Sequence, residues 1–480
     1  MGRGEMVVQS MVFPNQVCAE VGLYFRAEGE VYFEKERIYL LPHAKINTNT
    51  YMNLFDAGAW EKYTGVKSWK ICFQIKGVGK VSLKEGEHTI AALDIQSSQM
   101  IEKQIPFTYR KDAGQFFLEV ESENGVDLSA IHILAVGNRE AMPVRMAMNI
   151  CTYHRQKSLQ RILDVIGNSA FFQKNHALYG KLLIYVVDNA SEIERRPQEF
   201  VSVFHNPNTG GSGGFTRGLV EIRKTLSKTG VTHVIFMDDD VELISETLYR
   251  IYALLSLMKE SYQNEVIAGR MFRADDRKVQ YTAAEIWNKG DIRHIGFNVD
   301  MTMRTALGNV NNNIGAEYGG WWLCCFPMAF VKDNDPLPFF LHCDDVEYGL
   351  RHGGTPIILN GIQVWHETYE YRQSAVMAYY DYRNSLIVNA LYGFGETDKE
   401  KQWQDFLQRI NDIHDKGEYL LEYCIIRAFC DYRKGMRWFM KKNNAVIHGS
   451  LTKKKRAYRW TNVIRMKLAF LKEKGEMQFS

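Results

Sequence analysis

The sequence predicts an α/β domain flanked by an antiparallel β-sandwich on its N-terminal side and by a helical region on its C-terminal side. Three observations support this order. Short runs of β-branched and aromatic residues come first, strands alternating with helices follow, and helical periodicity fills the end of the chain. With 480 residues, the chain has room for two to four domains of roughly 100–200 residues each. We place the three regions at 1–143, 144–395 and 396–480.

The composition limits the classes of function. Hydrophobic residues make up 46% and charged residues 24%, the balance of a packed protein, which excludes global disorder. The net charge of +3 is too small for a surface devoted to nucleic acid, so we expect no nucleic-acid partner. The eight cysteines lack CxxC spacing, which favours reduced thiols in the cytoplasm. The longest apolar stretch, Trp321–Val331, is too short to span a bilayer, and we expect a cytoplasmic chain that is soluble or bound to a membrane surface.

The first region is expected to form the strands of the sandwich. Its apolar runs are Val21–Phe25, Val31–Phe33, Ile38–Leu40, Trp69–Ile75, Phe116–Val120 and Ile131–Ala135. Turns between such runs are indicated by Glu28-Gly29, Lys76-Gly77 and Asn124-Gly125. Because one fold serves many functions, a generic β module and a glycan-binding or docking domain both stay open.

The second region alternates strands with helices, which is typical of a mostly parallel sheet. The expected strands are Ala147–Cys151, Leu182–Val187, Val201–His205 and His233–Met237. The expected helices are Ser158–Gln173, Phe215–Ser227 and Ser245–Lys259, with a glycine-rich loop before the second of them. Ligands bind at the carboxyl ends of the strands in such sheets, so we expect the functional residues just after each strand.

The last of these strands is followed by three consecutive carboxylates, Asp238, Asp239 and Asp240. Alternate residues of a strand face the same side, so Asp238 and Asp240 are expected to converge while Asp239 points away. Two convergent carboxylates suit a hard divalent cation, which can hold a diphosphate. The alternative is a solvated acidic turn, but three like charges repel each other unless a cation neutralises them. We therefore expect a metal site here.

Two weaker signals lie upstream of this motif. Asp188 follows a strand and could accept the imide hydrogen of a uracil or thymine ring, or it could form an Asx turn or a helix cap. The glycine-rich run 206–218 could present backbone amides and Arg217 to a phosphate, or it could be only a flexible loop. It matches neither the dinucleotide-binding pattern nor the P-loop pattern.

Two further signals lie downstream. Paired carboxylates, Asp344 and Asp345, begin a predicted helix. One of them could act as a general base because a helix N-terminus favours the ionised form, and a charged helix cap is the alternative. His366 ends an apolar run. A lone histidine is more often structural, but one that follows a metal motif and a carboxylate pair is a candidate third ligand.

Taken together and in this order, these motifs resemble the nucleotide-sugar-dependent inverting glycosyltransferases of the GT-A fold. They are most similar to the bacterial galactofuranosyltransferases that polymerise galactan. The resemblance is carried by the segments 151–155, 188–191, 206–218 and 238–240, by Trp321-Trp322, by the segment 344–351 and by Trp365-His366. It implies an N-terminal β-sandwich, a GT-A domain and a C-terminal helical region.

The resemblance also implies a role for each site residue. Asp238, Asp240 and His366 would hold a Mn²⁺ or Mg²⁺ ion that bridges the diphosphate of the sugar nucleotide. The nucleotide would be bound by Arg155, Asp188, Asn208, Arg217 and Asp239. Asp345 would deprotonate the acceptor hydroxyl, with Asp344 as the alternative base. The pocket for the donor sugar and the acceptor would be lined by Glu285, Trp321 and Trp322.

The implied reaction is transfer of galactofuranose from UDP-galactofuranose to a hydroxyl of a cell-surface glycan, which could be lipid-linked. Alternatives that stay open are the same fold with another donor, such as dTDP-rhamnose, and a non-catalytic glycan-binding protein. A nucleotidyltransferase also uses a metal and a glycine-rich loop, but the paired carboxylates fit acceptor activation better. A homo-oligomer stays open as well.

The C-terminal tail combines basic and aromatic residues. Along 460–471 apolar positions recur near helical spacing with Arg465 and Lys467 between them. A basic amphipathic helix suits an anionic membrane, so we expect peripheral association with the inner face of the cell membrane. The alternatives are a helix packed on the protein's own acidic surface and a nucleic-acid-binding helix.

Overall fold

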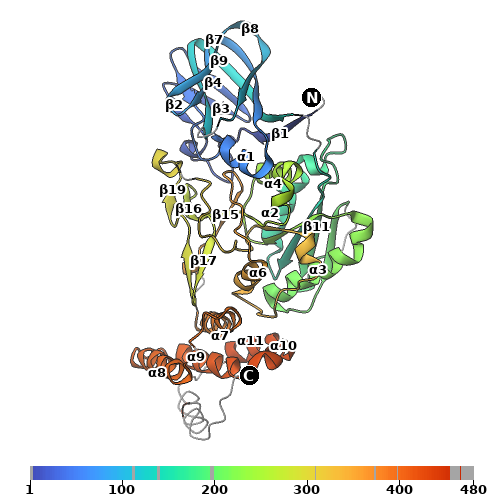
Figure 1. Cartoon of the computed structure of the whole chain (residues 1–480), viewed down its shortest axis with the longest axis vertical. Helices are drawn as coiled ribbons and strands as arrows, with labels where there is room; N and C mark the ends of the chain where they lie inside the picture. The colour runs from blue at the N-terminus through green and yellow to red at the C-terminus, as the bar shows by residue number, and fades with distance from the viewer. Residues whose placement is uncertain are drawn as a thin grey trace.

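The chain has three parts that follow one another along its longest axis. A computed structural model describes residues 4–110, 114–137, 141–194, 199–308, 310–371, 374–396, 398–453 and 465. Figure 1 shows the β-rich N-terminal part at one end, an α/β part in the middle and the C-terminal helices at the other end. Arg250 joins the first two parts, because its buried guanidinium donates hydrogen bonds to the carbonyls of Met52 (2.8 Å) and Asn360 (3.0 Å).

Three long antiparallel strands form the centre of the nine-stranded N-terminal sheet. They are β7 (Ser68–Glu85), β8 (His88–Thr108) and β9 (Gln115–Val136), and β7 pairs with both of the others. The shorter elements are β1 (Glu5–Ser10), β2 (Arg26–Glu28), β3 (Val31–Glu34), β4 (Arg37–Leu40), β5 (Lys45–Asn47), β6 (Phe55–Asp56) and α1 (Ala57–Thr64). Alternate residues along β7, from Trp69 to Ile75, are buried, which is the pattern of a sheet that covers a core with one face.

Two of the expected turns are wrong, because Lys76-Gly77 lies inside β7 and Asn124-Gly125 lies inside β9. Both glycines have a positive φ, 120° and 80°, and the register of β7 shifts next to Gly77. A bulge bends a strand without reversing it, so each strand continues along the same neighbours. The expected strand Val21–Phe25 is also wrong. A 3₁₀ turn, η1 (Val21–Leu23), takes its place, and its amides bond to carbonyls a few residues back.

The middle part is built on a six-stranded sheet. Its strands, in spatial order, are β12 (Val201–His205), β11 (Leu182–Asp188), β10 (Met146–Thr152), β13 (His233–Asp238), β20 (Cys324–Pro327) and β14 (Ile267–Ala268). The first four are parallel, and β20 is antiparallel to both of its neighbours. The helices of this part are α2 (Gln156–Gly167), α3 (Gly210–Thr229), α4 (Ser245–Leu257), α5 (Met328–Val331) and α6 (Asp344–His352). The carboxyl ends of the four parallel strands therefore lie along one edge. The assignment to the GT-A fold stays a prediction.

A smaller sheet and a hairpin complete the middle part. The sheet consists of β19 (Val299–Asp300), β16 (Val279–Thr282), β15 (Arg270–Arg273) and β21 (Gln363–His366). The hairpin consists of β17 (Glu285–Asn288) and β18 (Asp291–His294). Short 3₁₀ turns are η2 (Ala170–Phe172), η3 (Glu260–Tyr262), η4 (Arg304–Ala306) and η5 (Tyr369–Tyr371).

The C-terminal part is helical. It comprises α7 (Ala375–Tyr392), α8 (Lys399–Asp415), α9 (Tyr419–Tyr432), α10 (Gly435–Lys441) and α11 (Asn444–Thr452), which lie together at one end of the molecule (Figure 1). Helix α7 lies before the predicted boundary at 395/396 but packs with the C-terminal helices, since the Tyr379 hydroxyl donates to Asp431 Oδ2 of α9 (2.8 Å). Phe406 of α8 stacks on Phe429 of α9 with ring centroids 4.1 Å apart. Among the described residues, no helix has the length and apolar character needed to cross a membrane. The predicted amphipathic helix 460–471 lies outside the described residues except for Arg465, which pairs with the buried Glu422 of α9.

Candidate metal centre and catalytic carboxylates

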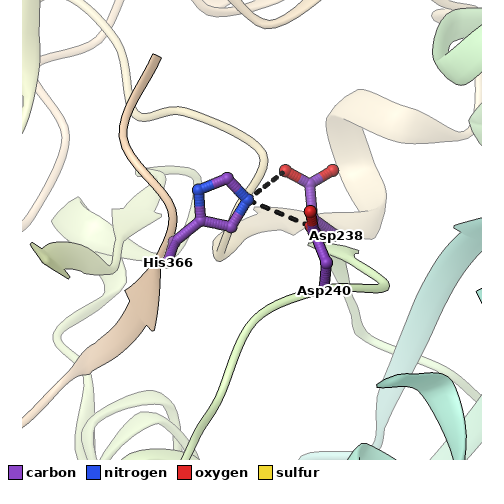
Figure 2. Close-up of side chains that lie close together, drawn as sticks. All are labelled: Asp238, Asp240 and His366. Atoms are coloured by element: carbon purple, nitrogen blue, oxygen red, sulfur yellow. Dashed lines mark hydrogen bonds and ion pairs between the residues drawn. The ribbon is translucent and has the colours of Figure 1, made fainter. Parts of the chain in front are cut away.

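Two carboxylates and one imidazole meet at the carboxyl edge of the six-stranded sheet. Asp238 ends β13, Asp240 lies two residues further on, and His366 ends β21. His366 Nε2 lies 3.0 Å from Asp240 Oδ1 and 3.6 Å from Asp238 Oδ2 (Figure 2). One potential ligand atom from each residue lies within 4.8 Å of the other two. The structure therefore brings together the three residues predicted to bind metal.

Backbone pairing places His366 beside the aspartates, although it is far away in the sequence. Glu242, just after the acidic run, exchanges two backbone hydrogen bonds with Trp365, of 2.8 and 2.9 Å. Trp365 is fully buried, and its indole donates to the carbonyl of Arg277 (2.9 Å). This bridge fixes the register between the two segments, so the side chain that follows Trp365 faces Asp240.

The donor set fits a divalent cation. Carboxylate oxygens are the ligands that Mg²⁺ and Mn²⁺ prefer, and an imidazole nitrogen among them favours a transition metal such as Mn²⁺. Adjacent ligand atoms of an octahedral ion lie about 3 Å apart, because each ligand lies about 2.1 Å from the ion. The 3.0 and 3.6 Å separations around His366 Nε2 are of this size. The shorter separation is also that of a hydrogen bond between His366 Nε2 and Asp240 Oδ1, and the metal site stays a prediction.

Arg155 and Asp239 adjoin this centre. Arg155 lies after β10, and its Nη1 donates to Asp239 Oδ1 (3.3 Å) and to Asp240 Oδ2. Asp239 is only 5% exposed, and burial together with the charge of Asp240 raises the pKa of Asp239. The guanidinium of Arg155 is half-exposed and able to contact a ligand as well. The nucleotide-binding roles predicted for both residues stay predictions.

The segment that precedes the paired carboxylates is held in an unusual conformation. Phe340, His342 and Cys343 have φ of 80°, 61° and 65°, values that residues other than glycine rarely adopt. Two residues of α7 hold this segment. Arg383 Nη2 donates to the carbonyl of Phe339 (2.8 Å), and Asn384 Nδ2 donates to the carbonyls of Leu341 (2.7 Å) and His342 (2.9 Å).

Arg383 and Asn384 are supporting residues that our sequence reasoning missed. Both side chains are completely buried, although they are polar and lie in a helix. Buried polar side chains are normally hydrogen-bonded, so adjacent Arg and Asn residues between the apolar residues of this helix could have indicated a structural task. Their task here is to fix the backbone that leads into α6 at Asp344.

The paired carboxylates begin α6 and lie among other negative charges. Burial raises the pKa of Asp344 to about 6. Burial raises the pKa of Asp345 well above its usual range, and the charges of Asp344, Glu285 and Asp238 add to that effect. The negative charge of Asp238, a predicted metal ligand, thus contributes to the raised pKa of Asp345, the predicted base. Asp344 faces α3, since a methyl group placed on Gly211 would lie 3.6 Å from Asp344 Oδ2.

Glu285 lies on the same side of the fold as Asp345. It begins β17, is only 1% exposed, and its Oε1 lies 3.0 Å from Nδ1 of His294 on the paired strand β18. Its negative charge contributes to the raised pKa of Asp345. The structure therefore brings Glu285 near the catalytic carboxylates, whereas its contact with a sugar stays a prediction.

Most of the glycine-rich run, from Gly210 on, forms the first turns of a helix, and residues 206–209 precede it. The expectation of a loop before a helix at Phe215 is wrong, because α3 already begins at Gly210. A methyl group on Gly210 would lie 2.1 Å from the carbonyl oxygen of Phe340, and one on Gly214 would lie 2.1 Å from Cys151 Sγ. The glycines allow α3 to pack directly on β10 and on the segment 340–343 that precedes α6. Close packing is therefore a sufficient reason for their presence.

Asp188 has the structural role that competed with nucleotide binding. Its Oδ1 accepts the amide of Ala190 (2.9 Å), and its Oδ2 accepts the amides of Glu192 and Ile193 (both 2.7 Å). The residue is 1% exposed. Both oxygens therefore organise the turn after β11, which is the Asx-turn alternative. A contact between Asp188 and a nucleotide base stays a prediction.

Asn208 and Arg217, also predicted to bind the nucleotide, lie at opposite ends of the first two turns of α3. Asn208 Oδ1 accepts the amide of Gly210 (3.0 Å). Arg217 Nε donates to Glu221 Oε1 (2.8 Å) one turn further along the helix. Both residues are partly exposed, and their nucleotide contacts stay predictions.

Trp321 and Trp322, predicted to line the sugar pocket, are both buried in the structure. Trp321 is 4% exposed and stacks on Phe236 of β13 with ring centroids 4.7 Å apart. Trp322 is 1% exposed, and its indole donates to the carbonyl of Gly269 (2.7 Å). The two indoles lie in the core behind the carboxyl edge, and their contact with a sugar stays a prediction.

The comparisons with known proteins agree with the motifs. No family model matches the chain. Galactofuranosyltransferase GlfT2 of Mycobacterium tuberculosis is 23% identical over 388 residues, which cover 73% of this chain and 59% of that protein. GlfT2 of Mycolicibacterium smegmatis is 22% identical over 396 residues, which cover 74% and 59%. This chain is galactofuranosyltransferase-like. The resemblance predicted from the motifs is thereby confirmed.

The extent of the match is partial. The chain spans 59% of the length of these two relatives. Among solved structures, the CBM22-1 xylan-binding domain of Paenibacillus barcinonensis Xyn10C is 13% identical and covers 28% of this chain and 98% of its own. The TM-score of 0.20 is too low to establish a shared fold.

Proposed function

We propose that this galactofuranosyltransferase-like chain is a metal-dependent glycosyltransferase. It would transfer galactofuranose from UDP-galactofuranose to a hydroxyl group of a glycan. The observation that carries the proposal is the convergence of Asp238, Asp240 and His366 next to the carboxylates that begin α6. The similarity to the two GlfT2 proteins supports the choice of donor sugar.

The proposed chemistry assigns one task to each group of side chains. Asp238, Asp240 and His366 would hold the divalent cation, which when bound supplies positive charge that stabilises the leaving diphosphate. Asp345 would accept the proton of the acceptor hydroxyl while that oxygen bonds to the anomeric carbon and the bond to the diphosphate breaks. A single displacement of this kind inverts the anomeric configuration.

The environment of Asp345 suits this task. Its pKa is raised by burial and by neighbouring negative charges, so its carboxylate binds a proton more strongly than an exposed aspartate does. A general base is most effective when its pKa lies near the working pH. The hydrogen bond from the Val346 amide to Asp345 Oδ1 (2.8 Å) occupies one oxygen and leaves the other for the acceptor.

Two competing functions are distinguishable from this one. The same site could take another donor, such as dTDP-rhamnose, because pocket shape decides donor identity. A non-catalytic glycan-binding protein would have no use for a metal trio beside a half-buried carboxylate with a raised pKa. That combination favours catalysis over binding alone.

The deciding experiment offers the purified chain UDP-galactofuranose, other UDP-sugars and dTDP-rhamnose with a synthetic galactan acceptor, with Mn²⁺ or with EDTA. Mass spectrometry of the acceptor measures transfer, and NMR of the new linkage reports its configuration. We expect transfer of galactofuranose, dependent on metal and with inversion. Asp333→Asn, at a carboxylate whose side chain is 75% exposed, serves as a control variant that keeps full activity. Transfer that persists in EDTA, or a retained configuration, would refute the mechanism.

We also propose that the acceptor is lipid-linked and that the C-terminal part contacts an anionic membrane. Met440 of α10 and Val446 of α11 are 51% and 66% exposed, and the exposed Lys441 directly follows Met440. Exposed apolar and basic side chains together suit a membrane surface. Co-sedimentation with anionic and neutral vesicles tests this. Equal pelleting with both, unchanged when residues after Ser450 are deleted, would contradict it.

A further inference from the structure

The guanidinium of Arg270, at the start of β15, is buried and has no anionic partner among the described residues. The residue is 2% exposed. Its Nη1 donates to Gln280 Oε1 (2.5 Å) and its Nη2 donates to the carbonyl of Val310, and both acceptors are neutral. Within the part of the chain that the structure describes, its Nε has no hydrogen-bond partner and the side chain forms no ion pair. Burying a cation without an opposing charge is strongly unfavourable, and burial lowers the pKa of Arg270.

Gln280 does not neutralise the positive charge of Arg270. Its Nε2 donates to the carbonyl of Gly296 (2.8 Å), which turns its oxygen toward Arg270. The ring of Tyr51 lies 5.8 Å from the guanidinium carbon and offers only the weak attraction of an aromatic face. Arg270 is therefore positioned by neutral groups that leave its charge unbalanced.

Arg270 lines a cavity of about 440 Å³ between β16, β19 and the segment 301–314. Much of the lining is apolar, and it includes Ile295, Val299, Met301, Met303 and Ile314. A volume of this size, with apolar walls and a few polar groups, is typical of small-molecule sites, which occupy roughly 300–1,000 Å³. Met303 and Ile314 are 54% and 82% exposed, so apolar side chains also surround the entrance.

Asp300, a carboxylate in the lining, does not compensate for Arg270. Its Oδ2 lies 3.4 Å from Lys278 Nζ, and its Oδ1 accepts the hydroxyl of Thr302 (2.6 Å). The hydrogen bonds from the hydroxyl and the amide of Thr302, together with Lys278, lower the pKa of Asp300, so the carboxylate stays ionised and its charge is balanced by Lys278. Among the described residues that line the cavity, Arg270 thus carries a positive charge that no carboxylate pairs with.

We propose that this cavity binds a small amphipathic anion, whose phosphate or carboxylate group pairs with Arg270 and whose hydrocarbon part lies against Val299, Met301 and Met303. A guanidinium presents its donors in a planar fork that matches both kinds of oxyanion. The apolar walls exclude water and thereby strengthen that pairing. The two features together select a molecule with a charged head and an apolar body.

The proposed site is separate from the metal trio. Strands β15 and β21 are parallel, with Arg270 opposite Gln363 and Arg273 opposite His366. Three residues of strand separate the two positions, which is about 10 Å. The cavity shares no lining residue with the trio or with α6. Binding there can therefore be measured without metal or sugar nucleotide, and its outcome is independent of the proposed glycosyltransferase activity.

The test is isothermal titration of the full chain, in EDTA, with hexyl phosphate, hexanoate, hexanol and inorganic phosphate. We expect one saturable site for hexyl phosphate or hexanoate, and whichever binds more tightly identifies the preferred head group. Hexanol lacks the charge and inorganic phosphate lacks the apolar part, so each should bind at least about tenfold more weakly than the better anion. Equal affinity for hexyl phosphate and inorganic phosphate would overturn the amphipathic assignment.

Variants locate the binding. Arg270→Gln should abolish it, but loss of a buried arginine could unfold the protein. Met303→Glu therefore provides a second variant at an exposed position, and Met303→Gln is its uncharged match. The glutamate should weaken anion binding about tenfold by repulsion at the entrance, while the glutamine changes it by less than about twofold. Equal affinities in wild type, Met303→Glu and any folded Arg270→Gln, or no saturable binding to the wild type below about 10 mM, would refute the site.

Discussion

The carboxyl ends of β11 and β13 lie on either side of β10 in one sheet, and each strand ends in an aspartate. Asp188 lies opposite Thr152 of β10, and Asp238 lies opposite Cys151. Asp188 is 1% exposed and uses both oxygens to accept backbone amides of its own turn. The side chain of Asp238 is 38% exposed and lies 3.6 Å from His366.

The difference shows that one sequence pattern, a strand that ends in an aspartate, can belong to two different structures. In the first, the chain turns back over the carboxylate and supplies its hydrogen bonds. In the second, the chain continues to Asp240 and Glu242, where it pairs with the segment that carries His366. Only the second arrangement leaves oxygens that converge on one point. The following predictions test this contrast, from the largest expected effect to the smallest.

The strongest test of the contrast is Asp240→Ala. We expect transferase activity to fall by roughly 10³-fold, because the variant removes one of three proposed ligands of the cation that stabilises the leaving diphosphate. The fold should survive, since the change also removes one of three adjacent like charges. Activity is measured with saturating Mn²⁺, and folding by circular dichroism. Near-normal activity in the folded variant would contradict the proposal that Asp240 binds a cation needed for catalysis.

The predicted base is tested by Asp345→Asn, which keeps the shape of the side chain and removes its basicity. Turnover should fall by roughly 10²–10⁴-fold, while the KM for the donor changes little because the donor would be held by other residues. Steady-state kinetics give both values. A variant that loses donor affinity and keeps its turnover would reassign Asp345 to binding.

At the other strand end, Asp188→Ala should act on stability. The substitution leaves three amides without their acceptor, and we expect a loss of about 2–4 kcal/mol in the free energy of unfolding. Urea denaturation measures it. Asp188→Asn keeps only one accepting oxygen and should lie between wild type and alanine. Unchanged stability together with weaker nucleotide binding would show that Asp188, like Asp238, acts on a ligand and does not mainly stabilise its own turn.

The packing of α3 beneath this edge is tested by Gly218→Ala. A methyl group there would lie 1.9 Å from Asn149 Oδ1 of β10, so the buried Asn149 side chain must leave its hydrogen bond to the Phe215 carbonyl or the helix must move away from the strand. We expect a loss of about 1–3 kcal/mol in urea denaturation. Gly167→Ala, at the end of α2, is the control because a methyl group there meets no described atom within 4 Å. Equal effects of the two variants would contradict the packing role of the glycines.

The smallest expected effect concerns pH. Asp345 accepts a proton only when ionised, so turnover should fall as the pH is lowered through its pKa. The charge of Asp344 raises that pKa, and Asp344→Asn removes the like charge. The pKa of Asp345 then falls, and the acidic limb of the pH–rate profile should move to lower pH by about one unit. A shift to higher pH would contradict the coupling between the two carboxylates.

The sequence alone determined the features that depend on short-range pattern. Buried strands followed by polar residues located Asp188, Asp238 and Asp240 at strand ends, because side-chain periodicity is a local property. The motifs also identified the resemblance to galactofuranosyltransferases, which the similarity to GlfT2 confirms.

Tertiary structure decided which of these residues can meet a ligand. Trp321 and Trp322 have the composition of a sugar-binding site, yet neighbouring strands bury both rings. The glycine-rich run became a closely packed helix because β10 and the segment at Phe340 leave no room for side chains. Burial and hydrogen-bond partners depend on residues far apart in the sequence, such as Glu242 and Trp365, and no local pattern encodes them. For the same reason, only the fold could show that Arg270 lies in a cavity with its charge unbalanced.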